Sequence, residues 1–179
     1  MYNLSYEQLE RWQNWKLFSG DQLSRMNEVE LTSDLALAMI SGLSGKTKKK
    51  IDELYAKYDD TFPATIEFTR RFRSVMNVID ENVGSNIAGS VFDREMHFYS
   101  LFLYVYDRLW GLGSPLKRTP AGSIPRNFQS KVMEVSRRFK TGEVPPKVLD
   151  SVARAATDLG RRRTRYLYTA TVLDGKSRA

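Results

Sequence analysis

The chain has 179 residues, of which 41% are apolar and 27% are charged, and it contains no cysteine. These values are typical of a single folded domain, and they exclude a disordered chain, a disulfide scaffold and a thiolate metal site. The N-terminus lacks a basic-then-apolar leader, and the longest strongly apolar run, residues 98–105, is far shorter than the roughly 20 residues of a membrane span. We therefore expect a cytoplasmic protein without membrane contact.

The net charge of +7 comes from the C-terminal part of the chain. Residues 1–100 carry 12 Lys and Arg against 15 Asp and Glu, a balance of −3, whereas residues 101–179 carry 16 against 6, a balance of +10. A basic surplus of this kind indicates an anionic partner for residues 101–179, and nucleic acid is the first candidate.

Two short helices are predicted around a longer one near the N-terminus. Residues 5–15 predict the first, because Ser5 and Gln8 have the spacing of a capping box and apolar residues follow at helical intervals. Residues 47–58 predict another, with Thr47 as its N-cap and apolar side chains recurring on one face.

Between them, residues 25–42 read RMNEVELTSDLALAMISG and predict the central helix. Its second half is apolar on nearly every side, which is typical of a buried helix. Asn27 and Glu30 have capping-box spacing at its start, and Gly42 is expected to end it. We expect Arg25, Asn27 and Glu30 to fix this helix start against neighbouring segments rather than to do chemistry.

A turn at residues 59–63 leads into the clearest helix, with Pro63 at or near its start. Its apolar face consists of Phe68, Phe72, Val75, Met76, Ile79 and Val83. Glycine, serine and asparagine in residues 84–90 predict a loop. Residues 93–110 then predict a second apolar helix that ends at Gly111. A buried strand over residues 98–106 is the alternative, but the length of the run and the lack of turn residues favour a helix.

The C-terminal part begins with residues 111–126, which contain three glycines and three prolines and predict a linker or long loop. Three more helices follow, the first on the apolar spacing from Phe128 to Phe139, the second opened by Pro145 and Pro146, and the last over residues 161–173. The predicted fold is all-α, a single domain of seven or eight helices around two central apolar helices. Its parts are an N-terminal core at 1–110, the loop at 111–126 and basic helices at 127–179 packed on the same domain.

The residues indicate no metal or cofactor site. His97 is the only histidine, and on so apolar a helix we interpret it as a hydrogen-bonded core residue. Glu30 and Asp34 share a helix face and could coordinate Mg²⁺, but acids at a helix start more often serve the dipole and the solvent. The Gly-Lys-Thr at 45–47 resembles the end of a phosphate-binding loop, yet Ile40 stands where that motif needs its first glycine, and a helix precedes it.

Basic residues near the C-terminus are the candidate nucleic-acid contacts. They cluster at the end of one predicted helix and the start of the last, with a tyrosine beside them: Arg137, Arg138, Lys140, Arg161, Arg162, Arg163, Arg165 and Tyr166. Lys117 and Arg118 lie on the loop between. Cations interleaved with aromatic faces are typical of single-strand binders. The alternative is a solvated face, or arginines paired with acids elsewhere in the fold.

Several segments stand in an order that resembles a known family. They are Trp12-x-x-Trp15, the RMNEVEL run at 25–31, Leu54-Tyr55, the FYSLF run at 98–102 and Arg163-x-Arg165-Tyr166-Leu167. This order is similar to the helical region of the GmrSD-type (ParB-like) restriction-system proteins, over roughly residues 8–173. The RMNEVEL run is the most specific piece, and it departs from the commoner form of the family, which has Asp at the place of Asn27.

The resemblance implies a part in phage defence and DNA restriction. Members of the family usually carry a ParB-like domain with an Asp-Gly-Gln-Gln-Arg motif, associated with nucleotide hydrolysis, and many carry a His-Asn-His nuclease domain. Neither motif occurs in this sequence, so the family's catalytic residues have no positions here. The expected function is a non-catalytic helical module that docks with or supports a ParB-like NTPase domain or a neighbouring gene product. A stand-alone basic helical domain that binds nucleic acid, with DNA as partner, is the alternative.

Overall fold

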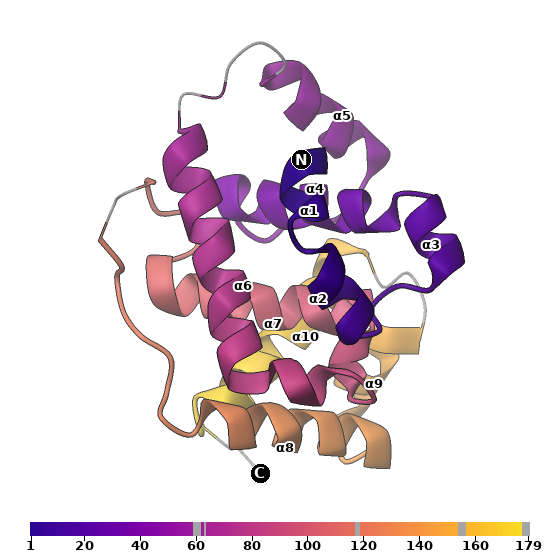
Figure 1. Ribbon diagram of the computed structural model, residues 1–179. Coiled ribbons are helices and arrows are strands. Elements are labelled where there is room, and N and C mark those ends of the chain that lie inside the picture. The colour runs from indigo at the N-terminus through magenta and orange to yellow at the C-terminus, as the bar shows by residue number, and fades with distance from the viewer. Residues whose placement is uncertain (59–61, 63, 117–118, 154–156, 177–179) are drawn as a thin grey trace.

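The computed structural model describes residues 1–179 except 59–61, 63, 117–118, 154–156 and 177–179 (Figure 1). Within these described residues the fold is entirely helical, which confirms the all-α prediction. The helices are α1 (Tyr2–Tyr6), α2 (Leu9–Asn14), α3 (Gly20–Ser24), α4 (Asn27–Ser41), α5 (Lys48–Lys57), α6 (Thr65–Ile87), the 3-10 helix η1 (Val91–Asp93), α7 (Glu95–Trp110), α8 (Phe128–Thr141), α9 (Pro146–Ala153) and α10 (Leu159–Leu173). Over the same residues, no helix is long and apolar enough to cross a membrane.

The two apolar helices α4 and α7 form the centre of the molecule. Every residue from 31 to 39 in α4 and from 97 to 106 in α7 is buried. Helix α7 contacts α4, α6 and α10, so neighbours on several sides cover its surface. Figure 1 shows α6 lying across α7, with α5 at one end of the molecule and α8 at the other. A helix that is apolar all round is stable only when enclosed in this way, and the alternative of a strand over 98–106 is wrong.

The chain before α4 folds into three short helices instead of one. Ser5 lies inside α1 and Gln8 is the N-cap of α2 without a side-chain cap bond, so the capping box predicted for this pair is wrong. The capping box that does form joins Ser19 and Gln22 at the start of α3. The division of this segment raises the number of helices above the seven or eight predicted.

The start of α4 also differs from its prediction. Helix α4 begins at Asn27, and Met26 occupies the N-cap position with φ 59° and no side-chain cap bond. Because α3 ends at Ser24, only Arg25 and Met26 connect it to α4. Met26 takes the left-handed conformation, which is uncommon for a side chain of this size. Asn27 already belongs to the helix, so the predicted capping box with Glu30 is wrong.

The loop predicted at 84–90 is helical over its first four residues, because α6 continues to Ile87. Glycine at position 84 serves packing rather than a turn. A Cβ on Gly84 would meet the Asp80 carboxylate and would lie 3.3 Å from the indole nitrogen of Trp15. The close approach of α2 to α6 requires the missing side chain.

Other helix ends agree with the sequence. The Thr47 hydroxyl accepts a hydrogen bond from the Lys50 backbone N–H at 3.3 Å and caps α5. Gly42 and Gly111 end α4 and α7 with φ of +78°. Residues 111–116 and 119–126 contain no helix. Most of the turn predicted at 59–63, and also Lys117 and Arg118, lie outside the described residues.

Candidate functional site

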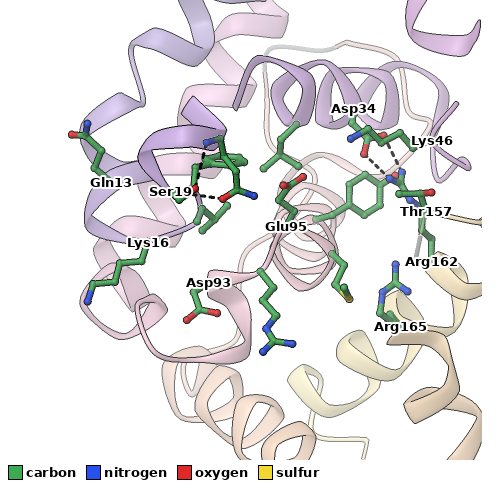
Figure 2. Close-up of a pocket in the computed structure, with 17 residues that line it drawn as sticks. Gln13, Lys16, Ser19, Asp34, Lys46, Asp93, Glu95, Thr157, Arg162 and Arg165 are labelled. Carbon is green, nitrogen blue, oxygen red and sulfur yellow. Dashed lines mark hydrogen bonds and ion pairs between the residues drawn. The ribbon is translucent and has the colours of Figure 1, made fainter. Parts of the chain in front are cut away.

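A cavity of about 780 Å³ lies between the α2–α3 connection, α4, the start of α7 and α10. Figure 2 shows that side chains from distant parts of the sequence point toward it. Helix α4 contributes Asp34, the connection before α5 contributes Lys46, α7 contributes Glu95, and α10 contributes Arg162 and Arg165. The central helix and the basic C-terminal cluster, separate features in the sequence, therefore meet at one site.

The wall of the cavity is built on a buried ion pair. The two Nη atoms of Arg162 donate to the two carboxylate oxygens of Asp34, at 2.9 and 2.6 Å, and the side chains are only 4% and 2% exposed. Arg162 also donates to the Ser44 carbonyl at 3.1 Å, and its guanidinium lies 4.1 Å from the centre of the Tyr99 ring. Burial lowers the pKa of Arg162, but the hydrogen bonds and charge of Asp34 outweigh it, so the net shift is upward. The Asp34 carboxylate is thus engaged on both oxygens by an arginine.

A second ion pair lies beside the first. The Lys46 ammonium contacts the Glu30 carboxylate at 2.8 Å, and the Lys46 backbone N–H donates to the Thr157 carbonyl at 3.0 Å. Lys46 in the Gly-Lys-Thr sequence therefore has a structural role. Neither Glu30 nor Asp34 belongs to a metal-binding arrangement, and no group of three or more metal-ligating side chains occurs in the part of the chain that the structure describes.

Glu95 is the first residue of α7, and its carboxylate lies near the middle of the cavity (Figure 2). Glu95 is partly buried, and its carboxylate makes no hydrogen bond or ion pair with a described residue. Burial raises the pKa of Glu95; the charge of Lys46 lowers it, and the charges of Glu30 and Asp34 raise it further. The net direction is upward, so this site disfavours the charged form of the residue.

The structure separates the predicted nucleic-acid residues into buried and exposed groups. Arg162, Arg165 and Tyr166 are buried. Arg165 donates to the Ser151 carbonyl, and the Tyr166 hydroxyl donates to Asp107 at 2.7 Å. Burial and the charges of neighbouring arginines lower the pKa of Arg165 to about 10. These three side chains hold α10 in the fold, as the alternative of internal pairing predicts.

The remaining basic residues lie nearer the surface, where most contact other groups. Arg137 pairs with Glu143 at 2.7 Å, Arg138 pairs with Glu134, Arg161 pairs with Asp150 at 3.2 Å, and the Lys140 ammonium donates to the Gly89 carbonyl. Arg163 is exposed. Of the eight side chains, Arg137, Lys140 and Arg163 are exposed, and the others are buried or partly buried.

The histidine at position 97 is a core residue, as predicted, but not in the expected state. His97 is buried, and its Nδ1 atom has no hydrogen-bond partner among the described residues. Its ring packs edge-on against Phe139, with centroids 4.6 Å apart, and also contacts Phe92. Burial, followed by the charges of Arg165 and Arg94, lowers its pKa to about 3. The ring is therefore neutral at physiological pH.

Two cavity residues, Glu95 and Lys46, could not be recognised as site residues from their sequence context. Glu95 stands at the start of a strongly apolar helix, where an acid is easily explained by the helix dipole. Lys46 falls in the Gly-Lys-Thr sequence at 45–47, which suggests only a comparison with nucleotide-binding loops. Their position beside Asp34 depends on contacts between helices.

Comparison with protein-family models, with curated proteins and with solved structures gives no match. The resemblance to the GmrSD-type family therefore rests on the sequence alone and stays a prediction.

Proposed function

We propose that this chain is a non-catalytic helical module of a GmrSD-like phage-defence protein, which docks with or supports a ParB-like NTPase domain. One observation carries the proposal. Three of the stretches that resemble the family, at 25–31, 98–102 and 163–167, each contribute a residue to the same cavity: Leu31, Tyr99 and Arg165. Segments that lie far apart in the chain share a single location, as a common binding role would require.

The chemistry of this location favours binding over catalysis. Asp34 and Glu30 are engaged by Arg162 and Lys46, so these carboxylates hold helices together. Buried ion pairs of this kind fix the relative position of elements. The cavity is then a rigid recess with a charged rim, on which a partner domain can dock.

The test is co-expression with a neighbouring gene product that contains a ParB-like domain, followed by size-exclusion chromatography and a nucleotide-hydrolysis assay. We expect co-elution, and we expect charge reversal at the exposed rim by Lys16→Glu with Arg94→Glu to weaken it at least tenfold. The matched control is Lys48→Glu with Lys147→Glu, which changes the same net charge at exposed positions that do not line the cavity. Separate elution of the two proteins, or equal loss in both variants, would contradict the proposal.

A further inference from the structure

The carboxylate of Glu95 differs from the other acids around the cavity because it has no hydrogen-bond or ion-pair partner among the described residues. Asp34 accepts from Arg162, Glu30 pairs with Lys46, and Asp93 accepts a hydrogen bond from the Gly89 backbone N–H at 3.0 Å. Glu95 lies among them, directed into the open space rather than into the protein (Figure 2).

The described cations around the cavity contact groups other than Glu95 or are exposed to solvent. The charges that act on Glu95 are those of Lys46, Glu30 and Asp34. Lys46 is paired with Glu30, Arg162 is paired with Asp34, and the buried Arg165 donates to the Ser151 carbonyl. Lys16 and Arg94 on the rim are exposed to solvent, which screens their charges. A cationic donor at Glu95 would give this carboxylate the pairing that Asp34 and Glu30 already have.

We propose that this cavity binds a guanidinium group of a ligand, and that the Glu95 carboxylate accepts its N–H donors. A carboxylate with both oxygens available matches the planar fork of a guanidinium, which forms two parallel hydrogen bonds. Phe18, Met96 and Tyr99 line the same cavity and provide apolar and aromatic surface for the alkyl chain that carries the cation. The site goes beyond the proposed function and does not depend on it.

A partly buried carboxylate without a partner also lowers the free energy of unfolding. Groups that destabilise the fold in this way are common at binding sites. The raised pKa of Glu95 shows that its charged form is disfavoured in the folded protein. Groups of this kind are retained where a ligand supplies the missing interaction. The ligand that fits is one that brings a positive charge.

The binding test is a titration of the whole chain with n-butylguanidinium and, separately, with an acetylated and amidated Gly-Arg-Gly peptide, followed by two-dimensional NMR. We expect saturable shifts of the backbone signals of Glu95, Met96 and Gln22, with a dissociation constant on the order of 1 mM for so small a probe. Glu95→Gln should weaken binding at least tenfold, and Glu95→Asp should retain part of it. The control Glu10→Gln removes an exposed carboxylate that does not line the cavity and should bind as the wild type does.

The two probes distinguish the source of the cation. Tighter binding of the peptide would assign the site to an arginine side chain of a protein, and equal binding would assign it to a small free cation. No saturation with either probe, or equal binding by wild type and Glu95→Gln, would overturn the proposal.

A second measurement separates a binding role from a structural one. Glu95→Gln removes a disfavoured charge, so we expect its thermal midpoint to rise at neutral pH. The difference in thermal midpoint between variant and wild type should shrink as the pH falls, because Glu95 of the wild type then becomes protonated. The groups that titrate or carry charge around the cavity are Lys46, Glu30, Asp34, Arg162 and Arg165, with Lys16, Asp93 and Arg94 on the rim. A lower midpoint for Glu95→Gln would mean that the carboxylate stabilises the fold, and this would also overturn the proposal.

Discussion

At the residue scale, the Asp34–Arg162 pair shows what a buried ion pair does here. Both side chains are almost completely buried, and their two hydrogen bonds join α4 to α10 across 128 positions of sequence. Replacing one member leaves the other as an uncompensated buried charge, which is far more damaging than losing a surface contact.

We therefore expect Asp34→Asn to lower the free energy of unfolding by about 3–5 kcal/mol, measured by urea denaturation. The control is Arg163→Gln, one position from Arg162 but exposed, for which we expect a change within about 0.5 kcal/mol. Equal, small effects of the two substitutions would show that the pair contributes little.

His97 makes the stability depend on pH in a defined direction. The pKa of His97 is lowered from 6.5 to about 3 in the folded protein. Between pH 6.5 and pH 3, the unfolded chain therefore binds a proton on His97 that the folded chain does not. Stability is then present above pH 6.5 and falls as the pH drops toward 3.

We expect His97→Phe to weaken this dependence, by on the order of 3 kcal/mol near pH 4 relative to neutral pH. The measurement is urea denaturation of wild type and variant across the pH range. Because the carboxylates titrate in both proteins, the difference between the two curves reports the histidine. Parallel curves would contradict the lowered pKa.

At the element scale, α6 shows that packing, rather than helix propensity, accounts for the glycine at position 84. By helix propensity alone, Gly84→Ala should stabilise a helix interior by about 1 kcal/mol. The added Cβ would instead meet the Asp80 carboxylate, which accepts a hydrogen bond from Arg11 at 3.0 Å, and would press on Trp15.

We expect Gly84→Ala to be destabilising by about 1–3 kcal/mol, as measured by thermal or urea denaturation, because overpacking at this contact outweighs the gain in propensity. Ser85→Ala, at the next and exposed position of the same helix, is the control and should be neutral or slightly stabilising. A more stable Gly84→Ala protein would show that the Asp80 side chain moves aside at little cost.

At the scale of the whole molecule, the basic surplus of residues 101–179 has a smaller exposed part than the sequence suggests. Arg162 and Arg165 are buried inside the fold, and Arg137 is paired with Glu143. Lys140 and Arg163 remain as exposed cations near the two ends of the predicted basic region.

If the alternative function of nucleic-acid binding applies, Lys140→Glu with Arg163→Glu should weaken binding of a DNA oligonucleotide and should lower the slope of affinity against salt by about 1 for each lost phosphate contact. Fluorescence anisotropy over a salt series measures both quantities. Exposed Lys48→Glu with Lys57→Glu, outside this region, is the control of equal charge. An unchanged slope of affinity against salt would mean that Lys140 and Arg163 do not contact the DNA phosphates.

Much of the helical content could be predicted from the sequence because its signals are local. The apolar spacing from Phe68 to Val83, the cap at Thr47 and the glycine stops at 42 and 111 act over one or two turns, and all appear in the structure. The errors occur where a nearby element overrides the local signal. Met26, one of the two residues that connect α3 to α4, is in the left-handed conformation. The approach of Trp15 explains a glycine inside α6.

By itself, then, the sequence determined that this protein is all-α and that α4 and α7 are its buried centre, because burial on every side leaves a continuous apolar run. Only the tertiary structure determined which charged side chains pair with one another inside the fold. Asp34 and Arg162 cancel each other's charge and become part of the scaffold, whereas the Glu95 carboxylate beside them has no partner among the described residues. Spacing along the chain could not separate these roles, because the energy of a charge depends on burial and on partners brought together only by folding.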